Sequence, residues 1–401
     1  MIKEAKTPLL VFGKGIFLKS STFNFTGVFA CLFIFFPAAL TAKFSETAVD
    51  LYPVKSQVKY AKGFSITYYG TYKVVNVINY YHNQKDTLQY LLVDRKYSIP
   101  RGYANAQVIR TPLRSIIGMS SMHIAMADFA ESANLIIGQG SLQYVTSPMV
   151  RQSIKAGKVK EVGLDGSMNL ELIISMHPDI VMVMGNPSAK FSRYQTLIGA
   201  AVPVLTNNEW LETTPLARME WVKLIAALLN NEELVNQKFA RVEREYQRLV
   251  QLAKKAKTRP TVIAGLPFKG TWLVPDADSY HTQFFRDAGT NYKWSNEKGT
   301  GSLPLSFEAV APTALKADFW LNLGYVNSKK DILAKDSRFA YFKPFKNSKI
   351  YNHNKKVNDI GANDFWESGG VNPHIILADL IKILHPELLP RHKLVYYKPL
   401  P

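Results

Sequence analysis

One long helical pattern divides the sequence into two halves. Residues 232–257 (EELVNQKFARVEREYQRLVQLAKKAK) contain neither Gly nor Pro and predict an unbroken helix that ends before Pro260. At about 1.5 Å per residue, this helix would span about 40 Å, the length of a domain rather than of a loop. We therefore expect a rigid strut between two lobes. A second helix start, Thr213-Thr214-Pro215, precedes it, because hydroxyls cap free amides and proline suits the first helical position.

Short apolar strands alternate with amphipathic helices on both sides of the strut. The strands before it include SIIGM, LIIGQ and IVMVMG, and those after it include TVIAGL, FWLNLG and KIYN. This alternation predicts mostly parallel sheets covered on both faces. Residues 60–109 instead alternate with a period of two between turn signals, which predicts a small antiparallel sheet.

The expected fold is therefore α/β, with two Rossmann-like lobes joined by a backbone helix and preceded by a β extension. The expected boundaries are 1–42 for a signal peptide, 43–110 for the β extension, 111–212 for the first lobe, 213–258 for the linking helices and 259–401 for the second lobe.

The N-terminal residues have the order of a secretory signal. Four lysines precede an apolar run at residues 28–36, and small residues follow at 38, 39 and 42. The run is shorter than the roughly 20 residues of a spanning helix. Cleavage near Ala42 would remove four Lys and one Glu, which lowers the net charge from +18 to +15. Cys31, the single cysteine, lies in the run, so the secreted chain would carry no thiol unless it is lipid-anchored there.

The two halves contain a weak internal repeat. NLELIISMHPDIVMVMG at 169–185 and SFEAVAPTALKADFWLNLG at 306–324 each place a polar residue, a Glu, a helix and a buried strand in the same order. Glu171 and Glu308 occupy equivalent positions in the repeat. Helix capping explains both carboxylates locally, and an exposed pair on two lobes would also suit salt bridges to a two-fold partner.

Aromatic and polar residues near predicted strand ends are candidates for a cleft between the lobes, since open α/β sheets bind ligands outside the carboxyl ends of their strands. Each aromatic residue taken alone is more often a core residue. Ser120, Ser121 and His123 open a helix, where amides and hydroxyls can hold an anionic group, although simple capping also explains them. The aromatic candidates are Tyr144, Trp210, Trp272, Tyr280, Trp294 and Trp366.

The sequence gives no sign of a catalytic or protein-built metal site. None of its eight histidines forms a spaced ligand pair on a helix, and no phosphate-binding, dinucleotide-binding or GxSxG motif occurs. We expect no catalytic residues, no metal ligands and no cofactor other than a ligand that arrives already chelated.

Three segments resemble the periplasmic binding proteins of ferric-siderophore and cobalamin ABC importers. They are SMNLELIISMHPDIVMVMG, LPLSFEAV and NDFWESGGVNPHIILADLIKILHPELLP, and the resemblance runs from about Thr111 to Pro390. It implies that Glu171 and Glu308 dock onto arginines of a permease dimer with its ATPase. It also implies that Trp366, the 120–123 loop, Trp210 and Trp272 line the ligand cleft. The extension at 60–109 departs from the short family members.

The resemblance and the charge together predict a periplasmic carrier of an iron chelate. A net charge of +15 favours an anionic ferric siderophore, while the aromatic residues would equally suit cobalamin or haem. A bilobed enzyme acting in the cleft is the competing hypothesis, and it would require a cleft acid or base with a shifted pKa. A nucleic-acid binder is disfavoured by the leader and by basic residues that are spread rather than clustered.

Overall fold

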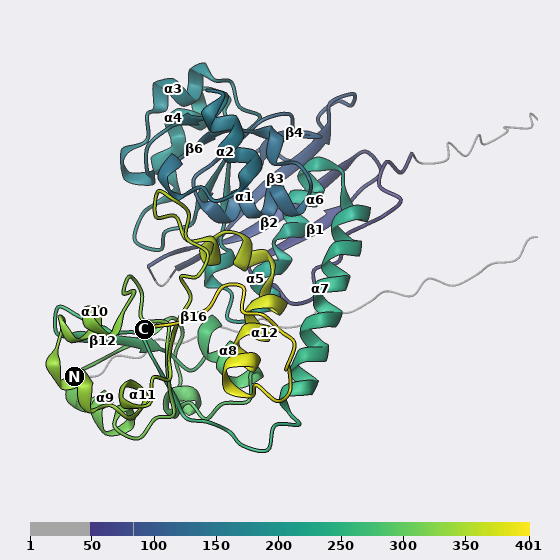
Figure 1. The fold of residues 1–401 in the computed structure, drawn as a ribbon. Coiled ribbons are helices and arrows are strands. Elements are labelled where there is room, and N and C mark those ends of the chain that lie inside the picture. The colour runs from purple at the N-terminus through teal and green to yellow at the C-terminus, as the bar shows by residue number, and fades with distance from the viewer. Residues whose placement is uncertain (1–48, 83) are drawn as a thin grey trace, which may run out of the picture. The chain divides into compact units, whose positions relative to one another are not determined.

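The computed structural model describes residues 49–82 and 84–401 (Figure 1). The predicted signal peptide at residues 1–42, with Cys31, lies outside the described residues. Within the described part of the chain, no helix is long and apolar enough to cross a membrane.

The β extension is a four-stranded sheet in the order β1-β2-β3-β4. Its strands are β1 (Phe64–Tyr68), β2 (Tyr72–Tyr81), β3 (Gln84–Asp94) and β4 (Gln107–Thr111). The first three are antiparallel, as predicted, but β4 runs parallel to β3 because residues 95–106 carry the chain back along the sheet. Alternating burial covers both faces: Val75 packs with the first lobe, and Val74 packs under the 95–106 connection.

The first lobe contains a five-stranded, fully parallel sheet in the order β7-β6-β5-β8-β9. The strands are β5 (Ile116–Gly118), β6 (Ile136–Gln139), β7 (Lys160–Glu161), β8 (Ile180–Met184) and β9 (Val204–Asn207). The helices between them are α1 (Ser121–Phe129), α2 (Pro148–Lys155), α3 (Leu170–Ser175) and α4 (Gln195–Gly199). The order of elements confirms the βα alternation expected from the sequence.

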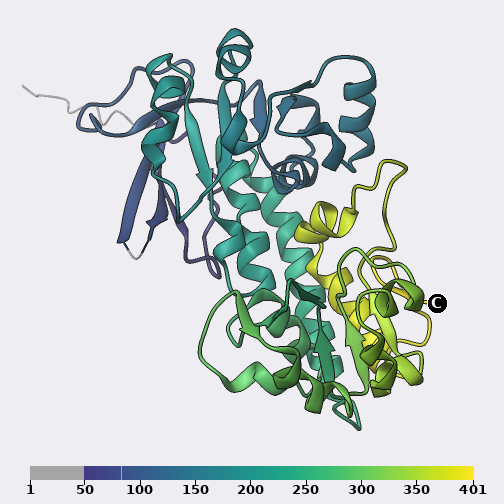
Figure 2. The same cartoon turned by 90° about the vertical axis from the view of Figure 1, so that its left-hand side faces the viewer.

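The predicted strut is α7 (Glu232–Ala253), which follows α5 (Pro215–Glu220) and α6 (Val222–Leu229). Its buried residues recur every three or four positions, so one stripe of the helix faces the protein. The N-terminal part of the stripe, Val235, Phe239 and Val242, belongs to the first lobe's core, and Tyr246 and Leu249 belong to the second lobe's core. One helix is therefore packed into both cores. Figure 1 shows its ribbon running beside both lobes, and Figure 2 shows the same lobes after a turn of 90°.

The second lobe has a sheet in the order β10-β14-β15-β16, in which only β16 is antiparallel. A small antiparallel sheet adjoins it. The strands are β10 (Val262–Ala264), β14 (Phe319–Leu321), β15 (Ile350–Asn352) and β16 (Lys398–Pro399), with β11 (Pro267–Phe268), β12 (Thr271–Pro275) and β13 (Ser302–Leu305) in the small sheet.

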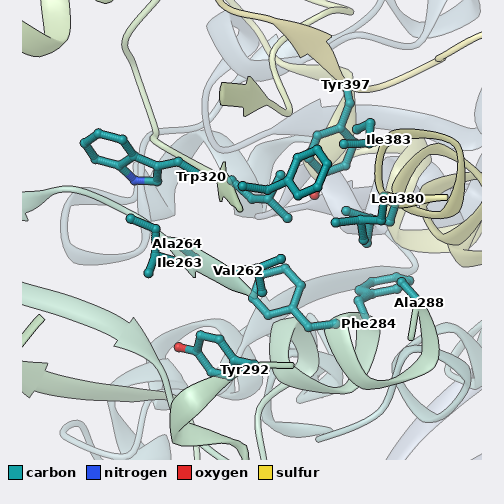
Figure 3. Close-up of a cluster of buried hydrophobic side chains, with 14 of the residues drawn as sticks. Val262, Ile263, Ala264, Phe284, Ala288, Tyr292, Trp320, Leu380, Ile383 and Tyr397 are labelled. Carbon is teal, nitrogen blue, oxygen red and sulfur yellow. The ribbon is translucent and has the colours of Figure 1, made fainter. Parts of the chain in front are cut away.

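Five helices surround these sheets. They are α8 (Tyr280–Asp287), α9 (Phe307–Ala314), α10 (Lys329–Leu333), α11 (Lys343–Lys346) and α12 (Pro373–Leu384). Figure 3 shows part of the core they enclose, where β10 side chains lie among residues of α8 and α12.

The lobes meet along a seam formed by residues 354–372 of the second lobe and residues 120–147 of the first. Two short helical turns lie there, η8 (Asp364–Trp366) and η9 (Ser368–Val371). Phe365 packs into the second lobe's core, whereas Val371 packs into that of the first. Gly370 and Met122 of α1 approach closely at the seam, where a Cβ atom on residue 370 would lie 2.4 Å from the Met122 sulfur and the methionine side chain would have to shift.

Candidate binding cleft

A cavity of about 620 Å³ opens between the lobes at the carboxyl ends of the second lobe's parallel strands. Gly265 follows β10, Asn322 follows β14, and His353 follows β15, and all three line the cavity. This is the position at which open α/β sheets bind ligands. The first lobe contributes Tyr144 to the same cavity, so the site spans both lobes.

Two histidines line this cavity: His353 is buried, and His281 is partly buried. His281 lies in the first turn of α8, which begins there because the Ser279 hydroxyl accepts from the backbone N–H of Thr282. Burial lowers the pKa of His281 to about 3, with a smaller effect from the charges of His353 and Arg218. Burial also lowers the pKa of His353 to about 4. Both imidazoles are therefore neutral at physiological pH, and each keeps a nitrogen lone pair.

Aromatic rings hold the two imidazoles in place. The His353 ring stacks on Phe365 with 4.4 Å between centroids. Trp366 makes T-shaped contacts, with its ring centroid 5.2 Å from that of His353 and 6.1 Å from that of His281. His281 Nε2 and His353 Nδ1 are buried and have no hydrogen-bond partner among the described residues. Buried polar atoms usually find a partner, so these two nitrogens are exceptions within the described part of the chain.

Two amides add unpaired groups to the same wall. Asn322 accepts from the Tyr397 hydroxyl through Oδ1 at 2.7 Å, which leaves its Nδ2 without a partner among the described residues. Asn354 donates to Val326 O and Asn327 Oδ1, and its own Oδ1 stays unpaired in the described part of the chain. The wall therefore offers donors and acceptors at fixed positions.

The cavity itself carries little charge. Its lining contains one Lys, Lys398, and no Asp or Glu. The net charge of +18 consequently does not gather there. Exposed apolar side chains line the opening instead, among them Tyr325, Leu273 and Val357. The site is suited to a ligand with aromatic or apolar faces and a few polar atoms.

Two of the predicted aromatic residues lie in the cavity. Tyr144 and Trp366 both line it, and the two residues are 55% and 44% exposed, so their rings are accessible from the cavity. Ser121 lies at the adjoining seam, where its hydroxyl is 3.4 Å from the backbone oxygen of Trp366.

The expectation that Trp272, Tyr280, Trp294 and His123 face the cleft is wrong. All four side chains are buried in cores. The indole N–H of Trp272 donates to Ala264 O, and the ring packs against Trp320. Tyr280 and Trp294 belong to the second lobe's core. His123 turns inward, where its Nδ1 accepts from the backbone N–H of Met119. Large rings gain more from core packing than from exposure at a strand end.

Two further candidates lie outside the residues that line the cavity. Ser120 caps α1, and its hydroxyl accepts from the backbone N–H of Met122, which is the capping role considered at the outset. Trp210 is 38% exposed in the turn after β9. A ligand role for either residue stays a prediction.

Glu171 and Glu308 occupy equivalent helical positions in the two lobes. Each lies in the first turn of its helix, α3 or α9, behind a capping residue, Asn169 or Ser306. Both are exposed, and the Glu308 side chain is 76% accessible with Arg338 3.8 Å away. In Figure 1, α3 lies at the outer end of the first lobe and α9 at that of the second.

The sequence reasoning missed His281, His353, Asn322 and Asn354. A usable signal was present, because Asn322 and His353 directly follow the buried strands FWL and IYN, and Asn354 comes one residue later. The rule applied to aromatic residues at strand ends would have found them had polar residues been included. Within the described part of the chain, no group of three or more His, Cys, Asp or Glu is placed to hold a metal ion.

Comparison with known protein families gives one match over this region. The profile of a family described as periplasmic binding protein matches residues 143–356. Among curated proteins, an uncharacterized lipoprotein of Methanocaldococcus jannaschii is 26% identical over 369 residues, which covers 85% of this chain and 84% of the relative.

Solved structures show the same fold. A periplasmic binding protein from Veillonella parvula superposes with a TM-score of 0.56 at 15% identity, covering 78% of this chain and 98% of that one. The periplasmic heme-binding protein of Vibrio cholerae superposes with a TM-score of 0.51 at 15% identity, covering 66% of this chain and 98% of the other. At such identities the likeness establishes the two-lobed fold and leaves the ligand open.

Proposed function

The chain belongs to the periplasmic binding protein family, and we propose that it captures an iron chelate, such as a ferric siderophore, between its lobes and delivers it to an ABC permease. The observation that carries this proposal is the pair of neutral imidazoles of His281 and His353, which line the interlobe cavity and each carry a nitrogen without a hydrogen-bond partner among the described residues. Imidazole nitrogen is a good ligand for iron, and two such groups can occupy coordination positions that a chelate leaves open.

The cavity favours one kind of chelate over another. A strongly anionic complex would leave most of its charge uncompensated, because Lys398 is the single cation in the lining. Tyr144, Tyr325 and Trp366 supply aromatic faces for an aromatic ligand. The proposal therefore narrows to a weakly charged chelate with aromatic groups and incomplete coordination of the metal.

Haem is the second candidate, and the same imidazoles favour it. A porphyrin leaves two axial positions on its iron, and histidine is a common axial ligand. The structural similarity to a heme-binding protein of Vibrio cholerae supports this alternative, and the titration below distinguishes haem from the other ligands. Cobalamin remains a third ligand for the test, since the aromatic walls would also suit a corrin ring.

An enzyme working in the cleft would need an acid or base whose pKa lies near the working pH. The imidazoles have shifted pKa values, but values of about 3 and 4 make them weak bases, and no carboxylate lines the cavity. These groups suit ligand binding better than proton transfer.

The remaining parts of the proposal concern export and docking. We propose that residues 1–42 export the chain and that Glu171 and Glu308 engage basic residues of the permease dimer, which works with its ATPase. Exposure of both carboxylates at equivalent helical positions supports the docking role. The relative described as a lipoprotein supports the alternative that Cys31 carries a lipid.

A ligand titration tests the proposal. Purified full-length protein is titrated with haemin, a ferric tetradentate catecholate, a ferric hexadentate siderophore and cyanocobalamin, while tryptophan fluorescence is followed. We expect quenching through Trp366 at micromolar ligand or below, with the tetradentate complex or haemin bound most tightly. A matched iron-free chelator is the control. Absence of any response to all four would refute the ligand class.

A further inference from the structure

Glu367 lies on the opposite side of the seam backbone from the cavity. It directly follows Trp366, which lines the cavity, but its own side chain is only 2% exposed. Its carboxylate accepts two backbone hydrogen bonds from the first lobe, from Thr146 N at 2.9 Å and from Ser147 N at 2.6 Å. One side chain of the second lobe thus holds the chain segment that carries Tyr144.

Neighbouring contacts bind the same segment. Asp364 accepts from the Thr146 hydroxyl at 2.8 Å, and Asn358 donates to Val145 O at 3.1 Å. Three consecutive residues of the first lobe, 145–147, are therefore fixed by side chains from residues 358–367. Because Tyr144 and Trp366 adjoin this junction, any shift in it changes the distance between the two cavity walls.

We propose that Glu367 is a positioning residue that latches the first lobe to the second and thereby sets the width of the ligand cleft. The inference rests on the proposed function, because it concerns the same cleft. It goes beyond that function by assigning the control of cleft width to a residue that touches no ligand.

The latch is a carboxylate buried at the edge of a second cavity of about 800 Å³ behind the seam. Burial raises the pKa of Glu367 to about 7, with a smaller contribution from the charge of Asp364 and an opposing effect of the Thr146 and Ser147 hydrogen bonds. The charged and titratable groups that face it across this second cavity are Asp128 of α1, Lys238 and Arg241 of α7, Lys356 and Asp364 of the seam, and His374 of α12.

These neighbouring groups do not reverse the upward shift of the Glu367 pKa. Asp364 is held ionised by hydrogen bonds from Ser368 and Thr146 and by Lys356, which together outweigh its burial and lower its pKa. Burial raises the pKa of Asp128 and lowers that of His374. Lys238 forms a salt bridge with Glu131 at 3.2 Å. The raised pKa of Glu367, about 7, therefore lies in the neutral range.

The sign of the pH effect follows from linkage. A latched Glu367 binds its proton more tightly than one released into water, where its pKa would return toward 4.5. Acidification therefore favours the latched state, and the effect weakens above pH 7, where the buried carboxylate is ionised in both states. Between pH 6 and pH 8 the equilibrium should move about tenfold toward the open state.

Hydrogen exchange on the ligand-free full-length protein tests the latch directly. In Glu367→Ala, we expect the protection of amides 145–147 to fall at least tenfold, with β8 and β14 unchanged. Exposed Glu387→Ala is the matched control and should change nothing. Unchanged protection of residues 145–147 in Glu367→Ala would overturn the proposal.

Glu367→Gln keeps the shape of the side chain but cannot titrate. In wild-type protein the protection factor of residues 145–147, corrected for intrinsic exchange, should fall about tenfold from pH 6 to pH 8. In Glu367→Gln this dependence should vanish. If the dependence persists in the variant, another group controls the junction and the proposal fails, even if Glu367→Ala proves too unstable to measure.

The dissociation rate of haemin or of the ferric catecholate completes the test. We expect faster release at pH 8 than at pH 6 in the wild type and equal rates in Glu367→Gln. The exchange experiment needs no ligand, so the two ideas fail separately. Loss of the latch signal with ligand binding intact refutes this inference alone, and an intact latch without chelate binding refutes the proposed function alone.

Discussion

The two lobes are alike on their outer ends and unlike at the cleft. Each outer end presents a short capped helix with an exposed first-turn glutamate, Glu171 on α3 and Glu308 on α9. At the cleft, the second lobe supplies two imidazoles and four asparagine amides, whereas the first lobe supplies Tyr144. The repeat in the sequence thus covers the elements that both lobes share. Tyr144, His281 and His353, which line the cleft, lie outside the repeat.

This asymmetry suggests a division of labour. The second lobe holds polar side chains at the ends of β14 and β15 and in the first turn of α8, so it can bind a ligand with defined geometry. The first lobe closes over that surface with an aromatic ring and is held in place by the seam. If the outer ends are equivalent, matching variants at the outer ends of the two lobes should reduce transport equally. If the inner walls differ, variants in the cleft should reduce ligand affinity to different extents in the two lobes.

The largest expected effect is on transport. Reversing both outer charges, in Glu171→Lys with Glu308→Lys, should reduce chelate uptake about 100-fold, because two attractive contacts with a basic partner become repulsive. Each single reversal should cost about tenfold, with equal losses for the two lobes. Uptake of iron-labelled chelate into vesicles that carry the permease would measure this.

Exposed Glu233→Lys on α7 is the control for the added charge. Chelate binding by the purified variants should be unchanged. A loss confined to one lobe would contradict the equivalence of the outer ends, and a loss of binding would place the carboxylate in the cleft.

The outer ends and the strut were predictable because local patterns determine them. A capped helix start requires only a polar residue and a few neighbours, and α7 requires only a run without Gly or Pro. The buried stripe from Val235 to Ala253, which packs into both cores, can be read from the same local sequence pattern. The pairing of β4 parallel to β3 was missed because strand order depends on the path of residues 95–106 rather than on the strands themselves.

The cleft was harder to predict because burial decides which residues face it. Trp272 and His281 both lie near strand ends, yet packing turns the tryptophan inward and the histidine toward the cavity. Sequence position gives the end of a strand, whereas side-chain direction depends on neighbours such as Phe365 and Trp320 that are distant in the chain. The same holds for Glu367, whose partners lie 220 and 221 residues away.

The second prediction concerns ligand affinity and tests the unlike inner walls. Removing both imidazoles, in His281→Ala with His353→Ala, should weaken binding of the ferric catecholate or haemin about 100-fold, since two ligating nitrogens are lost. Tyr144→Ala should weaken it by at most about tenfold, because it removes a single stacking contact. Fluorescence titration measures both, and the haem absorption spectrum reports loss of imidazole ligation.

Exposed His177→Asn in the first lobe serves as the matched histidine control. A larger loss from Tyr144→Ala than from the double histidine variant would show that the first lobe contributes most of the binding energy, which is the reverse of the proposed division of labour.

The smallest effect is on stability and compares the buried histidines of the two lobes. Burial lowers the pKa of His281 and His123 to about 3 and that of His353 to about 4, against an ordinary value of 6.5. In this range the unfolded chain binds more protons than the folded protein, so the free energy of unfolding should fall as the pH drops from 6.5 toward 4. At pH 5, replacing one of these histidines by Gln should recover about 2 kcal/mol relative to its effect at pH 7.5.

His281→Gln with His353→Gln removes two such histidines from the second lobe and His123→Gln removes one from the first, so the pH-dependent gain of the double variant should be about twice that of His123→Gln. Glu367 acts in the opposite direction, because its raised pKa adds stability that is lost as the pH rises from 4.5 through 7. Urea unfolding at pH 5 and pH 7.5 should therefore be measured in the Glu367→Gln background, where this opposing dependence is removed. Equal gains from the two lobes would show that the histidines of the cleft are already paired in solution.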